Sequence, residues 1–128
     1  MGAEMKLKLF VFQLIFVLIF VISCGGSMPL KAYENASGLR EKAVKYELQD
    51  YSKEQFDIAE ANFSEATILI NENNNRNAKK TAELLRTASN SYQTALNEGL
   101  PKYAETLKNE INSERESSRS IKAYKIDK

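Results

Sequence analysis

The chain has 128 residues, a length that suits one small domain. It carries 18 basic and 17 acidic residues, and a net charge of +1 excludes strong electrostatic attraction to nucleic acid. Histidine and tryptophan are absent, and only 5 glycines and 2 prolines occur, a composition that favours helices.

The first segment has the pattern of an export signal. Lys6 and Lys8 give it a positive start, and residues 9–22 are apolar with one exception. This run of about 14 residues has the length of a signal-peptide core, whereas a membrane-spanning helix needs roughly 20 apolar residues. We therefore expect residues 1–23 to form a signal helix that is removed after export.

The apolar run ends at the only cysteine, Cys24. The sequence Val21-Ile22-Ser23-Cys24 resembles the lipobox of bacterial lipoproteins. This resemblance implies cleavage before Cys24, diacylglycerol on its sulfur and an acyl group on the new amino terminus. Two or three acyl chains would hold the protein firmly in a membrane, whereas one chain binds only marginally.

The same resemblance implies a location in the bacterial cell envelope. Gly25, rather than aspartate, follows Cys24, which is similar to the sorting signal for the outer membrane. We expect a protein in that membrane that faces the periplasm or the cell surface. The alternative is an ordinary signal peptide cut at the same bond. It predicts a reactive or dimerising thiol, because a single cysteine has no partner within the chain.

Residues 24–30 are expected to form a flexible tether that reaches about 20 Å. Removal of residues 1–23, which hold Lys6, Lys8 and Glu4, leaves 105 residues with 16 basic and 16 acidic side chains. This mature chain has no net charge to attract nucleic acid or anionic lipid.

Three long helices are predicted from apolar residues at spacings of three and four. The first spans residues 31–49. The second spans residues 53–72, where Ser52 and Gln55 fit a capping box. It is apolar beyond one stripe, which predicts more than one neighbour and a middle position in a bundle. The three stripes are Ala32, Ala36, Leu39, Ala43 and Tyr46; Phe56, Ala59, Phe63, Ala66 and Ile70; and Ala78, Ala82, Leu85, Ala88, Tyr92, Ala95 and Leu96.

The third helix is expected over residues 78–98. The asparagine-rich stretch 71–77 before it predicts a solvated turn, with ligand binding by its amides as the alternative. Gly99 suits a carboxy-terminal cap, and Pro101 suits the first turn of a fourth helix. We expect this fourth helix to dock up to Ile111 and to loosen afterwards.

The predicted fold is therefore all-α, an antiparallel helical hairpin or up-and-down bundle of three to four helices after the signal helix. The bundle would span residues 31–122, and residues 123–128 would form a loose tail.

Residues 46–96 also resemble alanine-rich helical hairpins of bacterial envelope domains of unknown function, found on lipoproteins or ahead of peptidoglycan-binding domains. The stretch 51–56 and the regularly spaced alanines carry this likeness, although the central turn lacks the family's glycine. The resemblance implies no activity. The alanines are Ala59, Ala66, Ala78, Ala82, Ala88 and Ala95.

No motif for chemistry stands out. The chain has neither a glycine-rich phosphate loop nor a nucleophile motif, and no cofactor is expected. Glu110, Glu114 and Glu116 suggest a solvated acidic face, with calcium binding as the alternative. The tyrosines are expected to pack in the core, with a groove for peptide or glycan as the alternative. They are Tyr33, Tyr46, Tyr51, Tyr92, Tyr103 and Tyr124.

These patterns predict a lipid-anchored, non-catalytic interaction module whose partners are the membrane, through Cys24, and an envelope protein. One alternative is a structural tether that joins the membrane to peptidoglycan through Lys128. Another is an accessory solute-binding lipoprotein of a transporter. A nucleic-acid partner is not expected.

Overall fold

The structure is a computed structural model, and it describes residues 26–126. The expectations for the signal helix, the lipobox and Cys24 lie outside the described residues. The elements in chain order are α2 (Leu30–Lys45), α3 (Leu48–Tyr51), α4 (Lys53–Asn71), the short 3-10 helix η1 (Asn75–Asn77) and α5 (Ala78–Ile126).

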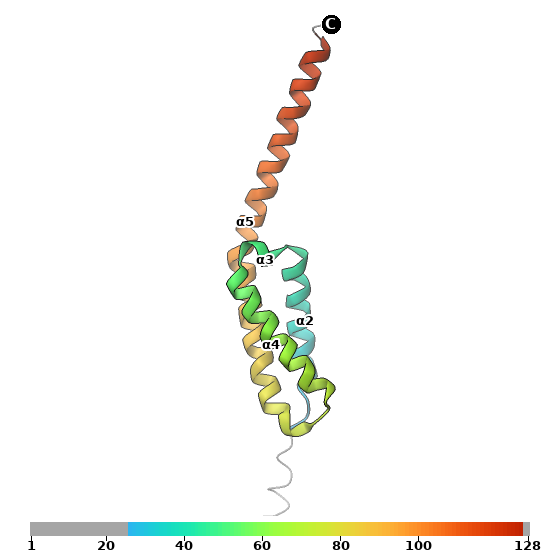
Figure 1. Cartoon of the computed structure of the whole chain (residues 1–128), viewed down its shortest axis with the longest axis vertical. Coiled ribbons are helices and arrows are strands. Elements are labelled where there is room, and N and C mark those ends of the chain that lie inside the picture. Colours follow the sequence, from blue (N-terminus) through green and yellow to red (C-terminus); the bar gives the residue numbers. More distant parts are fainter. Residues whose placement is uncertain (1–25, 127–128) are drawn as a thin grey trace, which may run out of the picture.

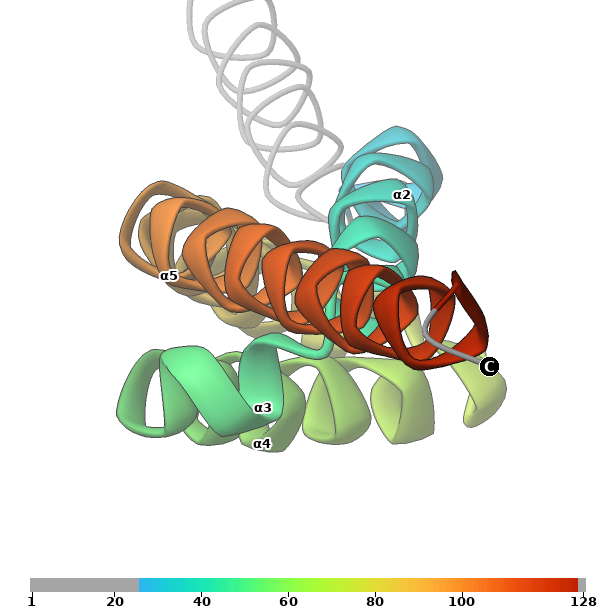
Figure 2. The same ribbon diagram turned by 90° about the horizontal axis from the view of Figure 1, so that it is seen from above.

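The all-α prediction is confirmed, since residues 26–126 contain helices and no strand. α2 and α5 run in the same direction, and α4, which lies between them in the sequence, runs in the opposite direction. The three helices thus form an up-down-up bundle (Figure 1). α5 packs against both α2 and α4, whereas the backbones of α2 and α4 approach each other little. Figure 2 shows α2 and α4 on different sides of α5.

The prediction that the second helix occupies the middle of the bundle is wrong. α5 has that position, and the second apolar side of α4 lacks a neighbour among residues 26–126. Ile58 and Ile68 on that side are 39% and 57% exposed. Apolar residues outside the main stripe of α4 therefore lie on the surface.

The core consists largely of the predicted stripes. Ala36 and Ala43 of α2 are fully buried, as are Ala88 and Ala95 of α5. Because alanine side chains are short, they allow the helix backbones to approach closely. Phe56, Phe63, Leu85 and Tyr92 fill the remaining space between the helices.

A tight corner follows α2, which ends at Lys45 instead of the predicted Gln49. Glu47 adopts a left-handed conformation (φ 54°), which turns the chain into the single turn of α3. The fully buried Leu48 anchors this corner in the core. The predicted capping box is wrong, because the hydroxyl of Ser52 donates to Glu98 Oε2 of α5 (2.8 Å) instead of capping α4.

α5 does not end at Gly99, so the predicted break between a third and a fourth helix is wrong. Gly99 has no positive φ and lies against the corner, where a side chain would collide with Leu48. Glycine at this position allows α5 to pack closely against the corner, and it does not cap the end of a helix. Pro101 lies inside the helix, and α5 bends where it leaves the bundle (Figure 1). A proline ring displaces the preceding turn and lacks the N–H for its hydrogen bond, so a bend is the expected result.

Beyond this bend, α5 leaves the bundle as a single helix (Figure 1). Tyr103 lies edge-on to Tyr46 and Tyr51 at the corner. We call residues 104–126 the arm. The prediction that this part docks up to Ile111 is wrong, since Leu107 is 40% and Ile111 51% exposed. The other helices described, α2, α3 and α4, extend no further than the corner, so among residues 26–126 they offer the arm no surface to pack against.

The first testable prediction separates the core from the arm. Leu85→Ala should lower the free energy of unfolding by about 2–5 kcal/mol, because Leu85 is fully buried. Ile121→Ala should change it by less than about 0.5 kcal/mol, because Ile121 is 58% exposed. Urea unfolding of the mature chain measures both, and equal losses would contradict the projecting arm.

The second prediction uses two helical glycines as a matched pair. Nothing lies within 4 Å of a Cβ added at Gly38, so Gly38→Ala should stabilise the protein by about 0.5–1 kcal/mol. A Cβ added at Gly99 would lie 2.6 Å from Leu48 Cδ2. Gly99→Ala should therefore destabilise the protein despite its better helix propensity, because overpacking costs about 1–3 kcal/mol. Thermal unfolding tests the opposite signs.

Candidate interaction site

The tether enters the bundle at the end where α5 begins. A Cβ built on Gly26 would lie 3.8 Å from the Cβ of Ala78, the first residue of α5. The turn between α4 and α5 lies at the same end, and the arm leaves from the opposite end (Figure 1). The two ends of the described chain are therefore separated by the full length of α5.

One polar network joins the three long helices. Arg40 of α2 donates two hydrogen bonds to Glu60 of α4, at 2.7 and 3.0 Å. The hydroxyl of Tyr92 of α5 donates to Glu60 Oε1 at 2.6 Å. The guanidinium of Arg40 also lies 5.7 Å from the ring centre of Phe63, which stacks on Tyr33. A single carboxylate thus collects donors from both neighbouring helices.

The pKa shifts in this network follow from these contacts. Burial alone would raise the pKa of Glu60, but the hydrogen bonds from Arg40 and Tyr92 outweigh it and lower the pKa below 4.5. The hydrogen bond with Glu60 raises the pKa of Arg40. Burial, followed by the contact with Glu60, raises the pKa of the Tyr92 hydroxyl. Near neutral pH, Arg40 therefore stays protonated, Glu60 stays ionised and Tyr92 stays neutral. These are the features of a network that stabilises the contact between helices.

Sequence reasoning placed Tyr92 in the core but missed Arg40 and Glu60. They lie beside the predicted stripe residues Leu39 and Ala59, where a charged residue usually faces water. Arg40 and Glu60 are 20 residues apart in the sequence, and Tyr92 is 32 residues from Glu60. No local pattern marks such a pair, so only the packing of the helices reveals it.

A shallow depression of about 280 Å³ lies beside this network, between α2 and α4. Arg40, Glu60 and Phe63 line it together with Ser64, Thr67 and Ile68. Its volume is just below the range of typical small-molecule sites, and its two charged groups already satisfy each other. The depression therefore offers little to hold a polar solute.

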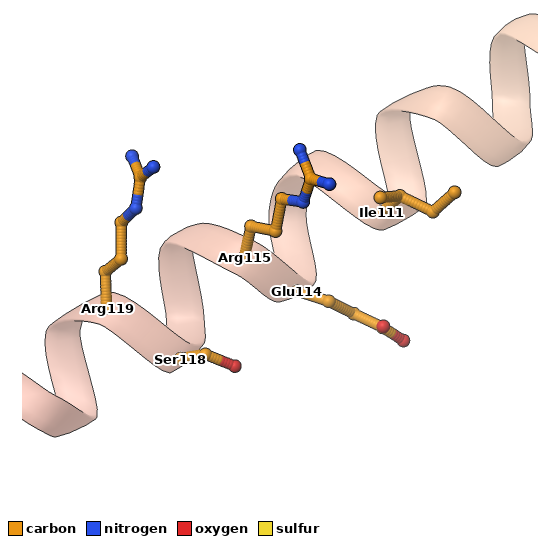
Figure 3. Close-up of a pocket in the computed structure, with 5 residues that line it drawn as sticks. All are labelled: Ile111, Glu114, Arg115, Ser118 and Arg119. Carbon is orange, nitrogen blue, oxygen red and sulfur yellow. The ribbon is translucent and has the colours of Figure 1, made fainter.

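Another concave surface lies on the arm. Ile111, Glu114, Arg115, Ser118 and Arg119 surround it, and all five come from one helix (Figure 3). Figure 3 shows Arg115 and Arg119 on one side of the helix, whereas Ile111, Glu114 and Ser118 point to another side. Two basic side chains thus lie on one side of this helix, and the exposed Ile111 lies on another side with Glu114 and Ser118. This is the pattern of a helix face that contacts another helix.

The tyrosines do not form a common groove. Tyr33 stacks on Phe63, and Tyr92 is buried between Phe56 and Phe63. Tyr46, Tyr51 and Tyr103 cluster at the corner, and Tyr124 lies near the far end of the arm. Packing accounts for five of these six residues.

The acidic residues Glu110, Glu114 and Glu116 lie exposed on the arm. Within residues 26–126, no group of three or more His, Cys, Asp or Glu side chains is arranged to hold a metal ion. The asparagine-rich stretch forms an exposed turn, as predicted: Asn73 is left-handed and the side chain of Asn74 accepts from the backbone N–H of Arg76. Its amides thus serve the turn itself.

The third prediction concerns the pH dependence of stability. Because the native pKa of Glu60 is lowered, its contribution is complete above pH 4.5 and is lost as the pH falls through the native pKa. Glu60→Gln should therefore lower the free energy of unfolding most near neutral pH, and the difference from the unaltered protein should shrink in acid. Denaturant titrations at several pH values measure it.

The matched control for this prediction is Glu54→Gln, at an exposed position of the same helix. It should leave the pH dependence as in the unaltered protein. A deficit for Glu60→Gln that stays constant at all pH values would show that the carboxylate charge does not hold the network.

Comparison of the chain with protein-family models, with curated proteins and with solved structures found no match. The likenesses to a lipobox and to alanine-rich envelope hairpins therefore stay hypotheses drawn from the residues. The function has to be argued from the bundle, its tether and its arm.

Proposed function

We propose that the protein is a lipid-anchored lipoprotein of the outer membrane of the cell envelope that acts as a non-catalytic interaction module. In this proposal the bundle is the base and the arm is the contact surface. The observation that carries it is the position of the tether at one end of the bundle and of the arm beyond the other (Figure 1).

A lipid on Cys24 would hold the base close to the membrane. Only Gly25 separates Cys24 from the first described residue, so the chain spans at most about 7 Å between them. Gly26 lies beside Ala78 at the start of α5. The bundle would therefore stand on the membrane surface with the α4–α5 turn at its foot.

The arm would then point away from the membrane. α5 has 49 residues, which gives a length of about 73 Å at 1.5 Å per residue. Across residues 26–126, no helix combines the length and the apolar character that crossing a bilayer requires. The arm has exposed apolar residues instead, at Leu107, Ile111 and Ile121. This arrangement supports recognition of a partner at a distance from the anchor.

A catalytic role has less support from the described residues. The groups with shifted pKa values, Arg40, Glu60 and Tyr92, bind one another. A general base near neutral pH most often is histidine, which this chain lacks. The accessory solute-binding alternative has only the shallow α2–α4 depression in its favour. We therefore place the function in the surface of the arm.

The structural-tether alternative shares one supporting observation with the main proposal. An arm directed away from the anchor would also carry Lys128 toward the cell wall. The two roles differ in chemistry, since the tether needs a covalent bond to peptidoglycan. Digestion of purified cell wall, followed by detection of the protein in the released fragments, distinguishes them.

The fourth prediction tests the anchor and the arm together. Cys24→Ala should abolish labelling with a fatty-acid analogue and leave a longer precursor in the cell. A photo-crosslinking residue at Ile111 should capture a specific partner in intact cells, and only with Cys24 present.

The matched control places the same crosslinking residue at Glu83, an exposed position of α5 within the bundle. It should capture much less. Unchanged fatty-acid labelling of Cys24→Ala would refute the anchor, and equal capture from both positions would refute the arm as the contact surface.

A further inference from the structure

The exposed apolar residues of the arm lie in two rows with a spacing of seven residues, which they share with smaller and polar side chains. Ala104, Ile111 and Ser118 form one row, and Leu107, Glu114 and Ile121 form a second row on the same face. Alternating spacings of three and four bring these rows into one stripe along a helix. Ile111 and Ile121 are 51% and 58% exposed, so the stripe has no partner among the described residues.

One flank of the stripe is basic, and the other carries one acidic residue. Lys108, Arg115 and Lys122, again seven residues apart, follow one flank. Glu110 lies on the other flank, and Glu114 lies in the stripe on that side. Figure 3 shows this separation for part of the arm, with Arg115 and Glu114 extending in different directions.

We propose that the arm pairs with the arm of a second copy of this chain, in a parallel two-stranded coiled coil. This inference rests on the proposed function, in which the arm is the contact surface, and names its partner. In a parallel pair the basic flank of each helix faces the acidic flank of the other. Glu110 of each copy then lies opposite Arg115 of the second copy.

The charges also select the direction of pairing. In an antiparallel pair, like flanks face each other, which would bring the basic rows together. Like-charge neighbours destabilise such a pair. Glu114 within the stripe would face Glu114 of the second copy, which weakens the pair, and Arg115 of the second copy would lie beside it. A shared anchor at the same end of both chains imposes the same parallel direction.

The pairing should be weak in solution and effective on a membrane. The stripe offers only three large apolar residues, Leu107, Ile111 and Ile121, over about 35 Å of helix. Such a contact buries less than the roughly 1,200 Å² of a stable standard interface. Confinement of both copies to one membrane raises their effective concentration and offsets this weakness.

The fifth prediction tests pairing by disulfide formation in cells that express the full chain. With Cys24 lipidated, single changes Leu107→Cys, Ile111→Cys and Ile121→Cys should each give covalent dimers under mild oxidation. Glu116→Cys, on the opposite side of the arm, should give none. The unaltered chain is the control for any disulfide through unlipidated Cys24.

Charge reversal tests the flanks. In the Ile111→Cys background, Glu110→Lys should reduce the dimer fraction several-fold, and so should Arg115→Glu. The double change Glu110→Lys with Arg115→Glu should restore it, because the complementary pairs return with exchanged signs. Circular dichroism checks that each variant keeps its helical content, which is expected for changes at exposed positions.

Four results would overturn the inference. These are the absence of dimers, equal dimer formation by Glu116→Cys, preferential linkage of Leu107→Cys to Ile121→Cys in co-expressed chains, and no rescue by the double reversal. If dimers are absent but the crosslinker at Ile111 captures another envelope protein, self-pairing fails and the proposed function stands. If neither forms, both fail.

Discussion

The bundle depends on the carboxylate of Glu60, which joins all three long helices. α2 and α4 meet mainly through long side chains, since their backbones approach little. The bidentate contact of Arg40 with Glu60 bridges this gap, and Tyr92 adds α5 to it. A hydrogen bond to a charged group is worth more than one between neutral groups. The alanine faces allow close packing, and this network links the three helices beside that core.

Much of the fold could be predicted because helix periodicity is a local property. The stripe of α4 and that of α5 up to Leu96 are buried as predicted, apart from Ile70 and Ala82, which are partly buried. The errors arise where tertiary contacts override local signals. Gly99 and Pro101 are residue types that often mark a helix boundary. Here Leu48 leaves no room for a side chain at position 99, and α5 continues through Pro101. The pairing of Arg40 with Glu60 leaves no local trace at all.

The candidate site also has one part that the sequence could predict and one part that it could not. Cys24 was identified from a contiguous pattern, which sequence reasoning handles well, and its lipidation stays a prediction because it lies outside the described residues. The arm was expected to dock, since an apolar stripe has the same spacing whether its partner is in the same chain or elsewhere. Only the lengths of α2 and α4, which end at the corner, show that Leu107 and Ile111 have no partner in the bundle.

The continuity of α5 fixes the rotational phase of the arm relative to the base. Each residue of a helix advances the direction of its side chains by about 100°, so the bearing of Ile111 is set by the register of Tyr92 and Leu96 in the core. One inserted residue near Pro101 would turn the whole outer face by that angle without disturbing the bundle. Seven would bring it back to within about 20°. An insertion that lengthens the arm therefore keeps the direction of Ile111 relative to the bundle only when it adds close to a whole number of helical turns.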